Sequence, residues 1–317
     1  MSSNLVAFAV RRLLAMIIVV FLIVTIVFFL AHLSPYDPIR IYLAQKYNVA
    51  NAARLRHEFG LDVPVWQQYL NYMGGLLHGD LGKSESYDSM GQPVWGMIRY
   101  GVPVTLKLGF YALVLSLLVG LPIGLISALK QNSPVDHGSQ TVMMILYAVP
   151  TFVLVPVCQL VIGADLKLLP VTGWGSPGLL GYQQMIMPVT LFAAGLAGYF
   201  AKSYRSFMLE VLSQDYIRTA RSKGLKERVI VYVHAAKNTL LPLASIVGPV
   251  VAYLIKGAFI VETFFGIPGV GYITVQSVVN SDYSVIEATT IMLAVFVVVI
   301  NFFTDIFYAF VDPRVRL

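Results

Sequence analysis

The sequence predicts an all-α membrane protein whose chain crosses the bilayer six times. Of its 317 residues, 57% are apolar and only 12% are charged, whereas soluble proteins carry about a quarter charged residues. The mean hydropathy is +0.75. A helix needs about 20 mostly apolar residues to span the hydrocarbon core, and six stretches meet that requirement. They lie at about 13–33, 104–129, 139–163, 186–207, 241–262 and 285–311.

The first stretch, LLAMIIVVFLIVTIVFFLAHL, follows Arg11 and Arg12 and therefore has the flanking charge of a secretory signal peptide. However, it exceeds the signal peptide's apolar region of about 7–15 residues, and it lacks a small-x-small cleavage site. We therefore expect residues 1–33 to form the N-terminus and a retained first transmembrane helix.

The positions of Lys and Arg in the short loops predict the orientation of the chain. If the N-terminus is cytoplasmic, the strongly basic stretch 202–237 also lies inside, and the two short outer loops carry only Lys167. The same placement puts Arg11, Arg12, Lys130, Arg314 and Arg316 on the inside. Both termini are therefore expected in the cytoplasm, in a multi-pass protein of a cytoplasmic membrane.

Residues 34–102 are expected to form an extracytoplasmic loop with short helices, and residues 103–317 a five-helix core. In the loop, Gly82-Lys83-Ser84 resembles the end of a phosphate-binding P-loop. That motif needs another glycine five residues before Gly82, where this chain has Leu77. We therefore expect no nucleotide site in this chain, so any ATP hydrolysis would belong to another subunit.

Other classes of site are also disfavoured. The single cysteine, Cys158, lies in an apolar run and is expected to pack there,. Five scattered histidines show no metal-ligand spacing: they are His32, His57, His78, His137 and His234. The net charge of +6 is divided by hydrophobic runs, so it forms no continuous face for nucleic acid. We expect no metal, cofactor or catalytic residue in this chain, and no nucleic-acid partner.

The stretch QDYIRTARSKGLKERV, residues 214–229, concentrates positive charge between the fourth and fifth spans. Gly224 separates two predicted helical pieces, 215–223 and 226–237,. Each piece has an apolar face. The first face comprises Tyr216, Ile217 and Ala220, and the second comprises Val229, Ile230 and Val233. A helix pair with an apolar ridge and basic flanks is typical of a segment that docks into a groove on a cytoplasmic partner.

DYIRTARSKGLKERVIVYVHAAKNTLLP closely resembles the cytoplasmic coupling segment of dipeptide and oligopeptide permease subunits of bacterial ABC importers. Further matches occur in order along the chain: VRRLL, HGDLGKS, GLPIGLISALKQN, MLEVLSQDYIRTARSKGL, VETFFGIPGVG and DPRVRL. The resemblance implies the ABC importer type I permease fold in a bacterial or archaeal cytoplasmic membrane. It also implies a second homologous permease, two P-loop ATPase subunits that bind ATP and Mg, and an extracytoplasmic substrate-binding protein.

The resemblance assigns residues by position within the family's E-A-A-x-x-x-G motif. Thr219, Ala220 and Gly224 match its middle, its alanine and its glycine, while Arg218 replaces the leading Glu. The terminal Leu241-Pro242 lies about five residues later than in sugar permeases. Within the segment 210–238, the residues expected to couple to the ATPase are Asp215, Tyr216, Ile217, Arg218, Thr219, Ala220, Arg221, Lys223 and Gly224.

Ionisable residues within spans are candidates for the translocation path or its gate. Lys256 in the fifth span could offer its cation to a peptide carboxylate, pair with an acid such as Asp305, or extend to an interface,. Glu262 and Thr263 open ETFFGIPGVG, which resembles the family's outer loop after the fifth span. This loop is expected either to contact the binding protein or gate the cavity, or to form a simple Gly/Pro turn capped by a carboxylate. Asp305 is expected to hold helices together.

Three alternatives remain open at this stage. An ion-coupled secondary transporter would use intramembrane acids such as Glu262, Glu287 and Asp305,, but it leaves the coupling-like loop unexplained. A scaffold or receptor would have a featureless loop there. Within the permease branch, peptides are the expected substrate, and the same branch resembles importers of nickel complexes, glutathione and oligosaccharides.

Overall fold

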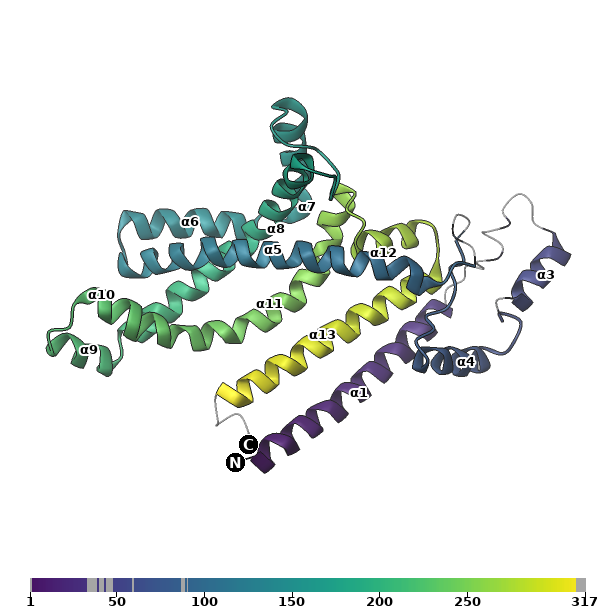
Figure 1. The fold of residues 1–317 in the computed structure, drawn as a ribbon, viewed down its shortest axis with the longest axis horizontal. Coiled ribbons are helices and arrows are strands. Elements are labelled where there is room, and N and C mark those ends of the chain that lie inside the picture. The colour runs from purple at the N-terminus through teal and green to yellow at the C-terminus, as the bar shows by residue number, and fades with distance from the viewer. Residues whose placement is uncertain are drawn as a thin grey trace. The chain divides into compact units, whose positions relative to one another are not determined.

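The computed structural model describes residues 2–32, 39, 43, 48–58, 60–86, 89 and 91–311, of which 2–6, 255–256 and 307–311 have only the backbone described (Figure 1). Arg314 and Arg316, which contribute to the expected orientation, lie outside these residues. Helices dominate, and β pairing in this part of the chain is limited to a bridge between Lys83 and Pro93. The prediction of an all-α membrane fold is confirmed.

The helices follow one another along the chain. They are α1 (Ser2–His32), α3 (Val49–Glu58), α4 (Val65–Leu77), α5 (Val94–Leu129), α6 (Pro134–Ala148), α7 (Thr151–Cys158), α8 (Leu179–Leu212), α9 (Asp215–Ser222), α10 (Glu227–Val229), α11 (Ala236–Phe265), α12 (Val270–Val279) and α13 (Tyr283–Val311). Two π-helical segments, η2 (Gln159–Asp165) and η3 (Ile230–Ala235), continue α7 and α10 respectively.

Five single helices within the described ranges are long and apolar enough to cross a membrane, and they correspond to five of the six expected spans. The third expected span is bent by 96° between α6 and α7. Val149 and Pro150, the two residues between α6 and α7, both have an extended backbone. This break follows from sterics, because a proline disfavours helical geometry in the residue that precedes it.

The fifth span begins earlier than the hydropathy predicts. The candidate span runs over Glu227–Leu254, because α10, η3 and α11 follow without interruption. The expected helical piece over residues 226–237 is helical from Glu227, but it continues into α11 instead of ending there.

The chain divides into two compact units. The first consists mainly of residues 1–105 and 268–303, and the second mainly of 106–267 and 304–315. The first has a buried core from α5, α12 and α13, comprising Val94, Ile98, Val270, Val285 and Ala288. Thr105 Oγ1 accepts a hydrogen bond from Val270 N at 2.9 Å, so the end of this part of α5 fixes the start of α12.

Ser84 of the Gly-Lys-Ser sequence is buried in the first unit. It donates a hydrogen bond to Asp282 Oδ2, and the backbone N of Glu85 donates to Asp282 Oδ1 at 3.2 Å. Asp282 also precedes α13 and accepts a 3.4 Å hydrogen bond from Val285 N. The polar residues of this loop therefore hold it against the start of α13. This is a structural role, which differs from the phosphate binding of a P-loop.

In the second unit, close helix packing relies on glycine. A Cβ on Gly120 of α5 would lie 2.7 Å from Ala197 O of α8, and one on Gly124 would lie 2.6 Å from Ala201 O. The spacing of these two glycines is the small-xxx-small pattern that lets helix backbones approach in membranes. Helix α6 packs on the same helix α8. The second unit is therefore built around α8.

Candidate functional site

The coupling segment forms a turn at one end of α8 and α11 (Figure 1). Helix α9 buries Ile217 and Ala220, and η3 buries Ile230, Val231 and Ala235. Helices α9 and α8 both contact η3. Burial of these apolar side chains joins the segment to the second unit. The segment is therefore packed against the helices of its own unit.

Gly224 ends α9 with a Schellman motif. Its backbone φ is +77°, and its N donates to Arg221 O at 2.9 Å, while Leu225 N donates to Ala220 O at 3.4 Å. These two bonds satisfy carbonyls that the helix end leaves free. An added Cβ would meet nothing within 4 Å. Glycine is therefore required by the left-handed backbone and not by crowding, as its place in the sequence motif indicated.

Polar contacts tie α9 to the segments that follow it. Arg221 donates to Glu227 Oε1 at 2.8 Å, which bridges Gly224 and joins α9 to α10. Asn238 of α11 donates to Tyr216 Oη at 3.1 Å. Arg221 and Glu227 are both about half exposed, so solvent weakens the attraction between them. The buried apolar contacts, rather than this ion pair, hold the turn in place.

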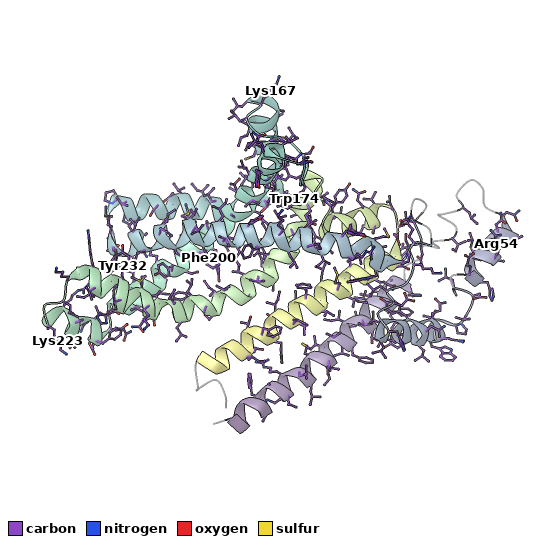
Figure 2. The ribbon with its side chains drawn as sticks, in the orientation of Figure 1. Arg54, Lys167, Trp174, Phe200, Lys223 and Tyr232 are labelled. Atoms are coloured by element: carbon purple, nitrogen blue, oxygen red, sulfur yellow. The ribbon has the colours of Figure 1, made fainter. Side chains whose placement is uncertain are left out.

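The exposed face of the turn differs from the expected docking ridge. Ile217, Ala220 and Ile230 are buried within the chain, so they cannot form the outer surface. The exposed apolar residues are Tyr216, Leu225, Val229, Tyr232 and Val233. They accompany the exposed basic residues Arg218, Arg221, Lys223, Lys226 and Arg228, and Figure 2 shows Lys223 at the tip of the turn. The site offers apolar side chains surrounded by positive charge.

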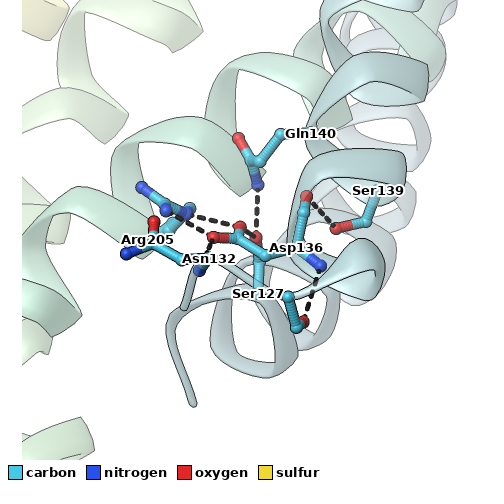
Figure 3. Close-up of polar contacts among 7 residues, drawn as sticks. Ser127, Asn132, Asp136, Ser139, Gln140 and Arg205 are labelled. Carbon is cyan, nitrogen blue, oxygen red and sulfur yellow. Dashed lines mark hydrogen bonds and ion pairs between the residues drawn. The ribbon is translucent and has the colours of Figure 1, made fainter. Parts of the chain in front are cut away.

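A buried polar cluster supports α8 before it reaches the turn (Figure 3). Arg205 of α8 donates to both oxygens of Asp136 in α6, at 2.7 Å from Nε and 2.6 Å from Nη2. Asp136 also accepts from Ser127 Oγ in α5 and from Asn132 N at 2.9 Å. One carboxylate therefore joins α5, the α5–α6 turn, α6 and α8.

This cluster was not predicted from the sequence. Ser133, Pro134 and Asp136 form a helix-start signal, and Ser133 Oγ does accept from Asp136 N at 3.3 Å,. That signal could have located the beginning of α6. The partner Arg205 is 69 residues away, so local spacing could not have connected the two.

The structure places the three expected path residues, Lys256, Glu262 and Thr263, in helix α11. Lys256 lies in α11, and its side chain is outside the described part of the chain. Glu262 is buried in the last turn of α11, and Thr263 donates to Phe259 O at 2.7 Å. Asp305 lies in α13 and is half-buried. Of the three expected path residues, Glu262 and Thr263 are therefore adjacent in the last turn of α11, while Asp305, expected to hold helices together, lies in α13.

The turn after Glu262 is a second Schellman motif. Gly266 has a φ of +64°, and Ile267 N donates to Glu262 O at 2.8 Å,. The end of α11 is held further by Gln159 of η2, whose Nε2 donates to Phe264 O at 2.9 Å and to Val171 O at 2.8 Å. Gln159 therefore positions the end of α11, a role that the sequence did not indicate.

Comparison with known proteins assigns this architecture to a family. A family model described as "Binding-protein-dependent transport system inner membrane component" matches residues 120–317. The chain belongs to this family. The model of the family's N-terminal part matches residues 5–109. The two matches together account for both the first span with its outer loop and the region that holds the coupling segment.

Relatives in the family match over almost their full length. The dipeptide transport system permease protein DppB of Lactococcus lactis is 38% identical, and the match covers 99% of this chain and 100% of that protein. The oligopeptide transport system permease protein OppB of Salmonella typhimurium is 34% identical, with 98% of this chain covering 99% of it. The chain is therefore an inner-membrane transport component with a permease architecture.

A solved structure supports the fold. The inward-facing MetNI methionine ABC transporter contains a chain that is matched over its full length by 70% of this chain, with a TM-score of 0.59 and 18% identity. At that identity the likeness concerns the fold alone. The expected ABC importer permease fold is confirmed, with the third span bent.

Proposed function

We propose that the chain is a permease subunit of an ATP-driven peptide importer. The observation that carries this proposal is the nearly full-length match to dipeptide and oligopeptide permeases. Because the match covers the loops as well as the spans, it supports the same task in transport as well as the same fold. Such a subunit would form the translocation path with a second homologous permease and would itself catalyse no chemical reaction.

The coupling role belongs to the turn formed by α9 and α10. Its exposed side chains combine apolar contact area with five cations, a composition suited to a groove on a partner with acidic edges. Two P-loop ATPase subunits would provide such grooves, one for each permease, and they would bind the ATP and Mg. Tyr216, Leu225, Lys223 and their neighbours would make contact, while Ile217 and Ala220 would hold the turn rigid from within.

The packing within the second unit suggests how motion would be transmitted. When the ATPases close on ATP, they would pull the turn as a rigid body. The turn packs on η3, and η3 packs on α8, while the Asp136–Arg205 pair joins α8 to α6. A displacement of α9 would therefore move several spans together instead of bending one loop.

Lys256, Glu262 and Thr263 remain proposed path or gate residues. Glu262 is fully buried, which disfavours direct contact with a substrate-binding protein and favours a gating or positioning role. Lys256 would attract the carboxylate of a peptide. Replacement of Lys256 by Met retains the length of the side chain and removes its charge, so unchanged peptide uptake by Lys256→Met would remove it from the path.

Peptides are the proposed substrate, delivered by an extracytoplasmic substrate-binding protein. Nickel complexes, glutathione and oligosaccharides are the alternatives within the branch, and an ion-coupled transporter is the alternative outside it. The test is to purify the tagged chain gently from its native membranes with the subunits bound to it, and to reconstitute that material in liposomes. Uptake of a labelled dipeptide and tetrapeptide should require ATP. Uptake driven by a proton or sodium gradient without ATP would contradict the proposal.

A further inference from the structure

The first unit contains a cavity of about 440 Å³ near the ends of two apolar helices. Its lining comes from the ends of α1 and α3, from the turn after α3, from α4, from the loop before α5 and from the start of α13. This volume lies in the range of pockets that bind small molecules, about 300–1,000 Å³. The coupling segment lies in the other unit, so the proposed contact with the ATPase does not explain this cavity.

The lining of this cavity is acidic, although the whole chain carries a net charge of +6. Its charged and titratable residues are Glu58 of α3, His32 of α1, Tyr72 of α4, Asp80, Lys83 and Glu85 of the loop, and Tyr283 and Glu287 of α13. Four carboxylates thus face one lysine. Glu58, Asp80 and Lys83 are exposed, and Glu287 is buried. The cavity therefore favours a cationic ligand.

Two polar atoms in the lining are buried and have no hydrogen-bond partner among the described residues. They are the hydroxyl of Tyr72 and Oε2 of Glu85. The other oxygen of Glu85 accepts from Ser284 Oγ at 3.1 Å, so its carboxylate is only half satisfied. A buried polar atom without a partner is costly and uncommon in folded proteins. Both residues line the cavity, so we expect a bound ligand with hydrogen-bond donors to satisfy these two atoms.

Aromatic rings complete the environment. Phe28 lies beside Tyr72 with ring centroids 5.6 Å apart, and it stacks on His32 at 3.9 Å. The faces of aromatic rings attract cations, organic cations in particular. By contrast, the described residues contain no group of three or more His, Cys, Asp or Glu side chains suited to a metal ion. Carboxylates beside aromatic rings favour an organic ammonium over a metal.

We propose that this cavity binds a small organic cation through its primary ammonium group, with Glu85 and Glu287 as the charged partners and Tyr72 as a hydrogen-bond acceptor. Burial raises the pKa of Glu85 to about 7, with a smaller contribution from nearby Asp282, although Ser284 opposes the increase. The pKa of Tyr72 is also raised, by burial and by Glu287, so its hydroxyl stays neutral. An ammonium would stabilise ionised Glu85, and binding should tighten as the pH rises through 7.

The test uses the purified full-length chain in lipid nanodiscs, in phosphate buffer that contains no amine. Butylammonium is the probe, because an alkyl ammonium remains charged between pH 6 and 8, and butanol is its neutral control. Calorimetry should detect butylammonium at pH 8, several-fold weaker binding at pH 6, and no binding of butanol. Equal binding of the two probes would overturn the proposal, as would stronger competition by Na⁺ or Ca²⁺ than by methylammonium.

Variants assign the effect to the cavity. Glu85→Gln keeps the shape of the protonated side chain and should weaken butylammonium binding at least tenfold at pH 8, with most of the pH dependence lost. Any pH dependence that remains in this variant would come from the other titratable groups of the lining. Tyr72→Phe should weaken binding several-fold at both pH values. Glu210→Gln, an exposed acid of α8 outside the cavity, is the matched control. Unchanged affinity in both cavity variants would refute the assignment.

Discussion

Arg205 and Asp136 form a two-pronged ion pair, with Nε–Oδ1 and Nη2–Oδ2 distances of 2.7 and 2.6 Å. The carboxylate is buried, whereas the arginine is 24% exposed. Planar guanidinium and carboxylate groups match in this arrangement. The pair therefore connects α6 with α8, the helix that leads directly into the proposed coupling turn.

Removing the arginine should strongly destabilise the second unit. Arg205→Ala leaves the Asp136 carboxylate buried without its cation, and breaking such a pair costs about 3 kcal/mol or more. Asp136→Asn in the same chain should recover part of the loss, since no buried charge would remain. Arg218→Ala is the control, because its pair with Asp215 is largely exposed and contributes about 0–1 kcal/mol. Thermal unfolding in nanodiscs measures all three, and equal losses in Arg205→Ala and Arg218→Ala would contradict the expectation.

Gly224 offers a test that separates backbone strain from coupling. Gly224 and Gly91 have φ values of +77° and +76°, and both have open space around an added Cβ. Gly224→Val and Gly91→Val should therefore cost similar stability, about 1–2 kcal/mol or somewhat more. Only Gly224→Val should reduce ATP-driven peptide uptake, because only Gly224 shapes the coupling turn. Equal uptake by both variants, at matched amounts in the membrane, would argue against a coupling role for the turn.

Two glycine substitutions should change stability in opposite directions. Gly124→Ala places a methyl group against Ala201 O, and such overpacking costs about 1–3 kcal/mol. Gly138 of α6 has nothing within 4 Å of an added Cβ, so Gly138→Ala should raise stability by up to about 1 kcal/mol through helix propensity. The unfolding temperatures of the two variants provide the measurement. A Gly124→Ala protein as stable as the parent would mean that α5 and α8 are less closely packed.

Glu85 should make the stability of the first unit depend on pH. Burial raises its pKa from the ordinary 4.5 to about 7, so between these values the folded chain retains a proton that the unfolded chain releases. Its contribution is therefore full below about pH 4.5, decreases as the pH rises, and levels off above about pH 7. Unfolding temperatures at pH 5 and pH 8, in buffer without amines, should show this decrease. Glu85→Gln should show a smaller decrease, and parallel profiles for the two proteins would contradict the assignment.

Apolar composition was sufficient to predict much of the fold. Long runs such as residues 13–33 and 285–311 could be identified as spans, because a helix is the form that satisfies every backbone hydrogen bond in lipid. The 96° bend in the third span could not be located in the same way. A mean hydropathy over 20 residues hardly changes when one of them is proline. The break nevertheless depends on two residues, Val149 and Pro150.

The candidate site was predicted less completely. Gly224 was identified correctly as a turn residue, since few other residues adopt a positive φ. The assignment of Ile217, Ala220 and Ile230 to an outer ridge was wrong. Periodicity identifies which side chains share a face, but not whether that face meets the chain's own core or a partner. The Asp136–Arg205 pair could not be predicted either, because it joins residues that are distant in sequence.

The most direct test of the central claim is a photo-crosslink from the tip of the coupling turn. A photoreactive amino acid at position 223 should join the chain to a P-loop ATPase when the transporter is irradiated in native membranes, and the yield should change on addition of ATP. The same residue at position 167, in the loop between η2 and α8, should give no ATPase adduct. An ATPase adduct at 223 alone is the predicted result. No adduct at 223, in membranes where the chain still transports peptide, would contradict the claim that this turn connects the permease to its ATPase.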